Sequence, residues 1–144
     1  MQAIRKFLIV LFMAVASTAV AQQTISISEL VNTKWRVENN WISDYKEYTL
    51  TEIIWKRKDG SFFKYPYYLT DTPVTSHDKS AFDYSKVGKT KKGSYMVSIN
   101  EKMGIVHCAS IESFDKKKGV FVVKVVTQGL IGASGGIERY KLVK

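Results

Sequence analysis

The sequence predicts an all-β protein: a single antiparallel up-and-down barrel of about eight strands, preceded by a short N-terminal helical turn. Short runs rich in β-branched and aromatic residues recur along the chain between turn signals, a spacing typical of sandwiches and barrels. No run of ten or more residues has the period of an amphipathic helix. A barrel is favoured over a sandwich because closure leaves no strand edge exposed to other chains.

Residues 1–21 have the three parts of a secretory signal peptide. Arg5-Lys6 gives a positive start, Phe7 to Ala16 forms an apolar run, and Ala19-Val20-Ala21 is a small-x-small cleavage site. The run is shorter than the roughly 20 residues of a membrane-spanning helix, so we expect cleavage rather than anchoring. We therefore predict export to the periplasm or the extracellular space. Residues 22–144 then form one domain without a transmembrane segment.

The first half of this domain is predicted from local signals. Ser26 and Glu29 fit a capping box, which starts a helix. Asp59-Gly60 between two strand-like runs indicates a hairpin, and Pro66 within the following run indicates an edge strand or a bulge. The elements predicted here are a helical turn within 24–32 and strands over 33–38, 48–56 and 61–70.

The second half continues the pattern with five further strands. The run 120–126 is apolar on both faces except for Lys124, which is typical of a central strand. The Gly-rich stretch 128–136 is expected to be a loop. The strands predicted here cover 81–87, 94–100, 105–111, 120–126 and 137–143.

The segment Thr24–Glu38, TISISELVNTKWRVE, resembles the opening of lipocalin-like (calycin) domains. There a helical turn precedes a first strand with a Gly-x-Trp signature. Trp35 stands at the signature Trp, whereas Thr33 occupies the Gly position, so the match is partial. The chain also resembles small exported lipocalin-like proteins of Bacteroidetes-type bacteria. The resemblance implies that Trp35 and Arg139 of the last strand close the barrel base as structural residues, through a cation–π contact of about 0.5–2 kcal/mol.

Aromatic residues are the most informative feature for function. Seven of them fall between positions 45 and 67, and buried phenol and indole groups need partners for their polar tips. An eight-stranded barrel has room for its own side chains or for one small ligand. We therefore predict that the interior binds a small hydrophobic or amphiphilic ligand. The predicted contacts are Tyr48, Trp55, Tyr65, Tyr67 and Tyr95.

The sequence predicts no catalytic residue, no metal site and no cofactor. A single cysteine excludes a disulfide framework and any multi-cysteine metal site. His107 and Cys108 are neighbours in a predicted strand, so their side chains point to opposite faces and cannot share one ion. An enzyme on the same scaffold remains a third hypothesis, and it requires at least two titratable side chains that converge in a cavity.

A second hypothesis is a structural or interaction module with a filled barrel or sandwich. Such a module would bind a protein or an anionic glycan through surface aromatics and basic turns, such as Arg57-Lys58 and Lys116–Lys118. The formal net charge of +9 falls to +7 without Arg5 and Lys6, which still accelerates association with anionic partners. Export argues against a nucleic-acid partner.

Overall fold

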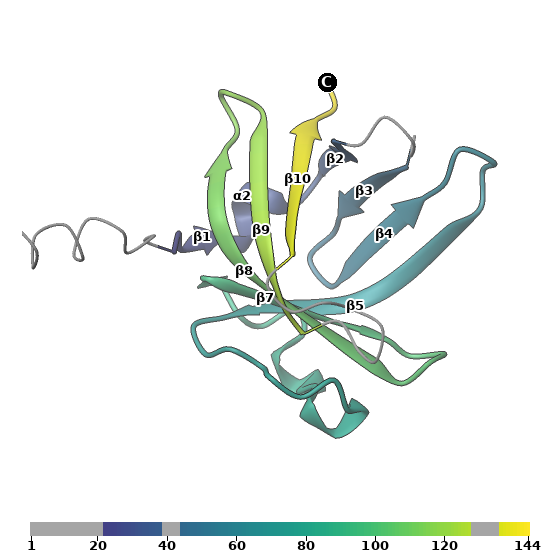
Figure 1. The fold of residues 1–144 in the computed structure, drawn as a ribbon, viewed down its shortest axis with the longest axis vertical. Coiled ribbons are helices and arrows are strands. Elements are labelled where there is room, and N and C mark those ends of the chain that lie inside the picture. The colour runs from purple at the N-terminus through teal and green to yellow at the C-terminus, as the bar shows by residue number, and fades with distance from the viewer. Residues whose placement is uncertain (1–21, 39–43, 128–135) are drawn as a thin grey trace, which may run out of the picture.

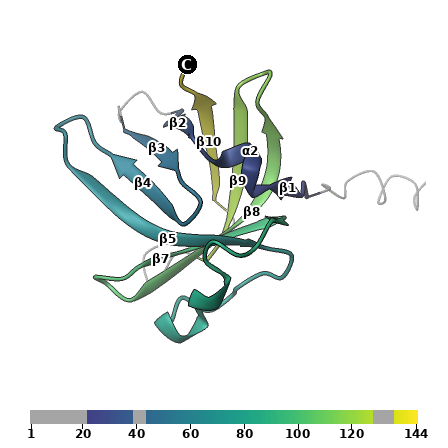
Figure 2. The same cartoon turned by 180° about the vertical axis from the view of Figure 1, so that it is seen from behind.

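The computed structural model describes residues 22–38, 44–127 and 136–144, so the predicted signal peptide, residues 1–21, lies outside the described part. Eight antiparallel strands form a closed barrel in the order β10-β2-β3-β4-β5-β7-β8-β9 (Figures 1 and 2). Neighbouring strands follow one another along the chain, and β10 closes the barrel on β2. The predicted all-β, up-and-down barrel is therefore confirmed. No helix among the described residues has the length and apolarity needed to cross a bilayer.

The barrel strands are β2 (Thr33–Val37), β3 (Tyr45–Tyr48), β4 (Glu52–Lys56), β5 (Phe62–Thr70), β7 (Tyr95–Asn100), β8 (Ile105–Asp115), β9 (Val120–Thr127) and β10 (Ile137–Leu142). Outside the barrel, β1 (Ile25–Ser26) pairs with β6 (Lys92–Gly93), and the helix α2 (Ile27–Leu30) leads into β2. Two short 3-10 helices, η1 (Lys79–Ala81) and η2 (Tyr84–Lys86), lie between β5 and β6. The predicted capping box is present, because the backbone N–H of Ser26 donates to the Glu29 carboxylate over 2.9 Å.

Trp35 lies at the centre of the main core. Its side chain is fully buried on the inner face of β2, and its ring centroid is 5.4 Å from those of both Phe114 and Phe121. The indole Nε1 donates to the hydroxyl of Thr33 over 2.8 Å, which satisfies a polar group that burial would otherwise leave unpaired. Thr33 thus has a role that a glycine at this position could not perform.

The predicted contact between Trp35 and Arg139 is absent. Side chains alternate along β10, and Tyr140 is the residue that faces the core. Arg139 is therefore exposed on the outer face of the barrel, and the aromatic rings of the core surround Trp35 instead.

The predicted strand 48–56 contains a turn: it begins at the last residue of β3, and only Glu52–Lys56 forms a strand within it. The backbone N–H of Thr49 donates to the carbonyl of Glu52, and the N–H of Glu52 donates to the Thr49 hydroxyl, each over 2.9 Å. The chain therefore reverses between β3 and β4. Pro66 ends the β4–β5 ladder, one residue before the β5–β7 ladder begins at Tyr67. Pro66 therefore requires neither an edge strand nor a bulge. At this point neither ladder uses the backbone N–H that proline lacks.

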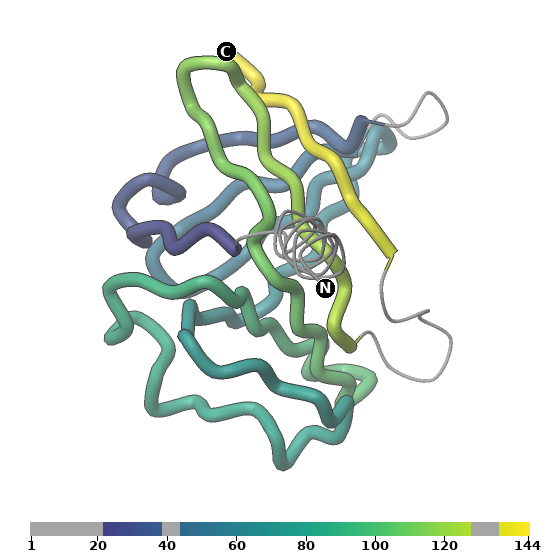
Figure 3. Tube along the Cα trace, turned by 60° about the vertical axis from the view of Figure 1, so that its left-hand side comes forward, coloured from purple at the N-terminus to yellow at the C-terminus, as the bar shows by residue number. Residues whose placement is uncertain are grey.

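The predicted strand at 81–87 is also wrong. This segment contains η2 and covers the outer face of β5, β7 and β8, as the teal part of the chain shows in Figure 3. A second apolar cluster forms beneath it, between the cover and the barrel wall. Its buried members are Tyr68, Phe82, Val97, Ile99, Val106 and Cys108, and Tyr95 packs against them.

Candidate functional site

The two ends of the barrel differ in how they are filled. At one end, which we call the floor, β2 starts and Ile27 and Leu30 of α2 join the core around Trp35. At the other end, the mouth, β2, β4, β7 and β9 end and β3, β5, β8 and β10 begin. The polar side chains of the inner face gather at the mouth.

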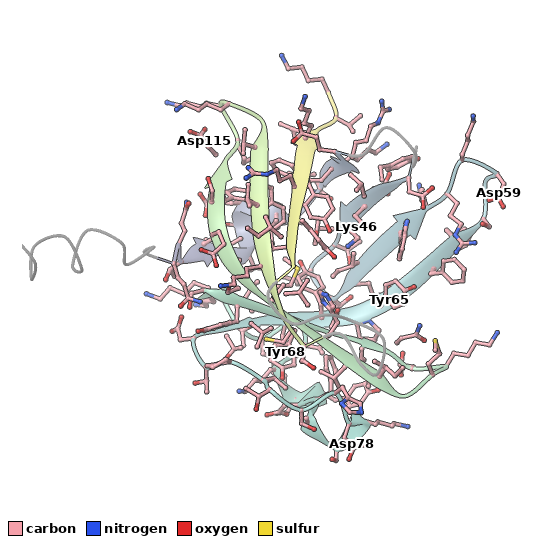
Figure 4. The ribbon with its side chains drawn as sticks, viewed as in Figure 1. Lys46, Asp59, Tyr65, Tyr68, Asp78 and Asp115 are labelled. Atoms are coloured by element: carbon pink, nitrogen blue, oxygen red, sulfur yellow. The ribbon has the colours of Figure 1, made fainter. Side chains whose placement is uncertain are left out.

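The strand register places Lys46 inside the barrel. Lys46 is the cross-strand partner of Trp35 on one side and of Trp55 on the other, and directly paired residues share a face. The β4–β5 register adds Phe63 as the partner of Trp55. A half-buried lysine therefore stands on the inner face among aromatic side chains (Figure 4).

A chain of hydrogen bonds starts at this lysine. Lys46 Nζ donates to the Tyr140 hydroxyl over 3.0 Å, and that hydroxyl donates to the carboxylate of Glu138. Glu138 and Tyr140 are two residues apart on β10, so both face the interior. His107 on β8 faces the same space, since it pairs with Ser98, whose other partner is the buried Tyr67. We call Lys46, His107, Glu138 and Tyr140 the mouth cluster.

The protonation states of the mouth cluster follow from burial and mutual charge. Burial and the nearby Lys46 ammonium lower the pKa of His107 to about 4, against the opposing effect of Glu138. Burial disfavours the charge on Glu138, but Lys46, the Tyr140 hydroxyl and His107 outweigh it and lower its pKa. Burial and Glu138 raise the pKa of Tyr140 well above its usual value. At neutral pH the cluster thus holds a neutral imidazole, a carboxylate and a protonated phenol.

Lys46 has no carboxylate partner. The three ion pairs of the described residues join Lys34 and Lys56 to Glu47 and Lys141 to Glu38. All 13 Asp and Glu residues lie in the described ranges, so no acid elsewhere in the chain could pair with Lys46. Its ammonium instead lies 5.0 Å from the ring centroid of Tyr140 and 5.6 Å from that of Trp55.

An aromatic wall, formed by Trp55, Phe63 and Tyr65, stands beside this cation. Trp55 and Tyr65 have ring centroids 6.5 Å apart, and Phe63 stacks on Tyr65 at 6.4 Å with an interplanar angle of 13°. The Trp55 indole donates to the Asp44 carboxylate over 2.9 Å, which fixes the ring at the rim. Phe63 remains 40% exposed, so the wall is accessible from outside.

The five predicted ligand contacts fall into three places. Trp55 and Tyr65 belong to the aromatic wall. Tyr48 and Tyr67 lie deeper, fully buried with ring centroids 5.8 Å apart, where they fill the barrel. Tyr95 packs on the outer cluster beneath the 71–91 segment, on the other side of the sheet. The structure thus brings two of the five to the mouth.

The mouth cluster itself was missed by the sequence analysis. Lys46 lies between Tyr45 and Glu47 on β3. Only the alternation of side chains along the strand, which points Lys46 inward, distinguishes it from a solvated lysine. Glu138 and His107 had the same ambiguity, since each could face solvent or the interior. A signal was available in Glu138 and Tyr140, which share one strand face in the last predicted strand, but their partners come from β3 and β8.

Comparison of the chain with protein-family models, with curated proteins and with solved structures gave no match. Its fold is the closed eight-stranded antiparallel barrel that the lipocalin resemblance implies.

Proposed function

We propose that this chain is an exported, lipocalin-like binding protein that holds a small amphiphilic anion at the mouth of its barrel. One observation carries the proposal: the half-buried ammonium of Lys46 lies on the inner face between aromatic rings, without a carboxylate partner. Trp55 and Tyr65 would contact the apolar part of the ligand, and Lys46 would bind its anionic group.

Electrostatics favour an anion at this place. Two opposite charges attract more strongly where protein replaces water, and a charge-assisted hydrogen bond contributes about 1.5–3 kcal/mol. The ammonium has three donors, and the described contacts use one of them on Tyr140. The Glu138 carboxylate accepts from the Tyr140 hydroxyl and not from Lys46, so the other two N–H donors of the ammonium are available to a ligand.

The packing below the mouth limits the size of the ligand. Tyr48, Tyr67 and Phe121 fill the interior, with Tyr48 and Phe121 in edge-on contact at 6.3 Å between ring centroids. The ligand would therefore lie against the aromatic wall rather than deep in the barrel. A short chain or a single ring system fits this position better than a long lipid.

The mouth cluster brings several titratable groups together, as the enzyme hypothesis required, but their protonation favours binding over catalysis. General acid–base catalysis works best with a group whose pKa is near the working pH. The pKa of His107 is about 4, that of Glu138 is lowered and that of Tyr140 is raised, so each keeps its proton state around neutral pH.

Displacement of the anionic dye 1-anilinonaphthalene-8-sulfonate by decanoate and by decan-1-ol tests the proposal. Decanoate should displace the dye, and the neutral alcohol should displace it far less well. Lys46→Met should weaken decanoate binding about tenfold or more, which corresponds to about 1.4 kcal/mol. Lys124→Met, on the exposed outer face of β9, is the matched control and should leave binding unchanged. Equal affinity for acid and alcohol, or an unaffected Lys46→Met, would refute the proposal.

Export is tested separately. When the full chain is expressed in a bacterium with a working secretion pathway, intact-mass spectrometry of the exported fraction should give a polypeptide that begins at Gln22. A full-length protein that stays in the cytoplasm would contradict this part of the proposal and leave the binding site unaffected.

A further inference from the structure

The outside of the barrel carries a concentration of positive charge on its first strands and on β10. We call this surface the outer basic face. It combines eight basic and four acidic residues that point outward or lie in the β4–β5 turn, so its formal net charge is +4. The basic residues are Lys34, Arg36, Lys56, Arg57, Lys58, Lys64, Arg139 and Lys141, and the acidic residues are Glu38, Glu47, Glu52 and Asp59.

The strand register arranges these residues in rows across the strands. One row runs from Lys141 through Arg36 and Tyr45 to Lys56 and Phe62, each residue being the cross-strand partner of the next. Neighbouring strands are about 4.8 Å apart, so the row presents its cations and rings as a continuous strip.

This strip ends in a groove of about 470 Å³ on the outer side of the β4–β5 hairpin. The groove contains three basic side chains and no acidic one. Its lining residues are Tyr45, Ile54, Lys56, Arg57, Gly60, Phe62 and Lys64. Gly60 has φ of 87°, a conformation that favours glycine in the turn of this hairpin.

Each cation of the groove lies near an aromatic ring. Lys56 Nζ is 5.9 Å from the centroid of Tyr45, and Lys64 Nζ is 6.0 Å from that of Phe62. The Arg57 guanidinium lies 4.9 Å from the ring of Phe63 at the rim. Cation–π contacts hold the charges beside apolar surface. The groove therefore offers positive charge and an exposed ring together, and Phe62 is 57% exposed.

Two of the three cations have no carboxylate partner. Glu47 accepts ion pairs from Lys34 at 3.1 Å and from Lys56 at 3.3 Å. Arg57 and Lys64 belong to none of the ion pairs, and all acidic residues of the chain lie in the described ranges. Asp59 of the same turn is near enough to Arg57 for their charges to interact, but the two form no ion pair, so an anion in the groove would meet two cations that no ion pair occupies.

We infer that this groove binds a short acidic oligosaccharide, with carboxylate groups on Arg57 and Lys64 and a sugar ring against Phe62. An acidic sugar carries its carboxylate on the ring that presents an apolar C–H face, which matches cations fixed beside aromatic rings. Extended acidic peptides commonly bind by adding a strand to a sheet edge, but the closed barrel has no free edge. Single-stranded nucleic acid stacks successive bases on several rings. Of the two rings that line the groove, Tyr45 has Lys34 and Lys56 over it, which leaves Phe62 as a single platform.

Tetragalacturonate and its methyl ester are suitable probes, because the ester keeps the sugar and removes the charges. Thermophoresis of the labelled mature protein should show saturable binding of the acid and little binding of the ester. Arg57→Gln/Lys64→Gln should weaken binding about tenfold or more, and Phe62→Ala by several fold. The control Lys116→Gln/Lys118→Gln removes the same charge from the exposed β8–β9 turn and should change the affinity by less than about twofold.

Two outcomes of these binding measurements would refute the inference. If the turn variant weakens binding as much as the groove variant, the attraction is general electrostatics and the inference fails. If polyglutamate or oligothymidylate binds at least as tightly as tetragalacturonate, the occupant is an acidic peptide or a nucleic acid and the inference also fails. Lys56, Phe62 and Lys64 lie on the outer face of the sheet and Lys46 on the inner face, and only Arg57 reaches the rim beside Phe63, so Lys46→Met should leave glycan binding intact. The two proposals can therefore fail independently.

Discussion

The floor and the mouth of the barrel are built from the same strands, yet their side chains have different chemistry. On β3, the buried Tyr48 faces the floor and the half-buried Lys46, two residues away, faces the mouth. On β10, Leu142 packs against the core toward the floor, whereas Tyr140 and Glu138 of the mouth cluster lie toward the mouth. Along both strands, apolar packing thus gives way to hydrogen-bonded and charged groups toward the mouth. The comparison indicates that the floor is built for packing, while the mouth carries the charged side chains on which the proposed binding rests.

The largest expected effect is at the floor. Trp35→Ala should lower the free energy of unfolding by about 3–5 kcal/mol, because it removes a fully buried ring that packs on Phe114 and Phe121. Trp55→Ala at the mouth should cost much less, because its ring is half-exposed. Urea denaturation of both variants measures this difference. Equal losses would remove the distinction between floor and mouth.

The next effect is the dependence of stability on pH, which the mouth controls. The pKa of His107 falls from an ordinary value of 6.5 to about 4 on folding, so the unfolded chain binds more protons between these values. Its contribution to stability is therefore complete above pH 6.5 and is lost as the pH falls toward 4, by at most about 3 kcal/mol. The lowered pKa of Glu138 acts in the same direction at still lower pH.

Denaturation curves between pH 7.5 and pH 4 should show this loss in the natural chain and a clearly smaller loss in His107→Gln. An equal pH dependence in both proteins would show that His107 is not the buried neutral group described here.

The smallest expected effect is a difference between Tyr67 and Tyr65, two tyrosines of β5. The Tyr67 hydroxyl donates to the carbonyl of Thr49 over 2.7 Å, so Tyr67→Phe should lower the free energy of unfolding by about 1 kcal/mol. Tyr65→Phe, nearer the mouth, should change stability little but reduce the affinity for decanoate, because its hydroxyl would orient the ligand. Thermal unfolding and dye displacement on both variants give the comparison, and reversed effects would contradict it.

Local signals were enough to predict the fold class, the capping box at Ser26 and Glu29, and the hairpin at Asp59-Gly60. The strand count was right for a partly wrong reason, because the predicted strand at 81–87 does not exist and β3 was not recognised as separate from β4. Phe82 and Tyr84 are spaced like strand residues, but the partners that bury Phe82 lie on the outer wall of the barrel. Only the folded sheet reveals that surface.

The site was harder to predict than the fold, because it depends on strand parity. Tyr95 has the residue type expected of a ligand contact but lies on the outer side of β7, and Arg139 likewise faces outward. A shift of one residue in register reverses the face of every side chain on a strand. The mouth cluster also combines β3, β8 and β10, whose adjacency around the mouth follows from barrel closure rather than from sequence spacing.

A crystal structure of the mature protein with decanoate tests the central claim most directly. The account predicts carboxylate density within hydrogen-bond distance of Lys46 Nζ and the alkyl chain along Trp55 and Tyr65. Density only on the outer wall, or a mouth that stays free of ligand at saturating decanoate, would contradict it.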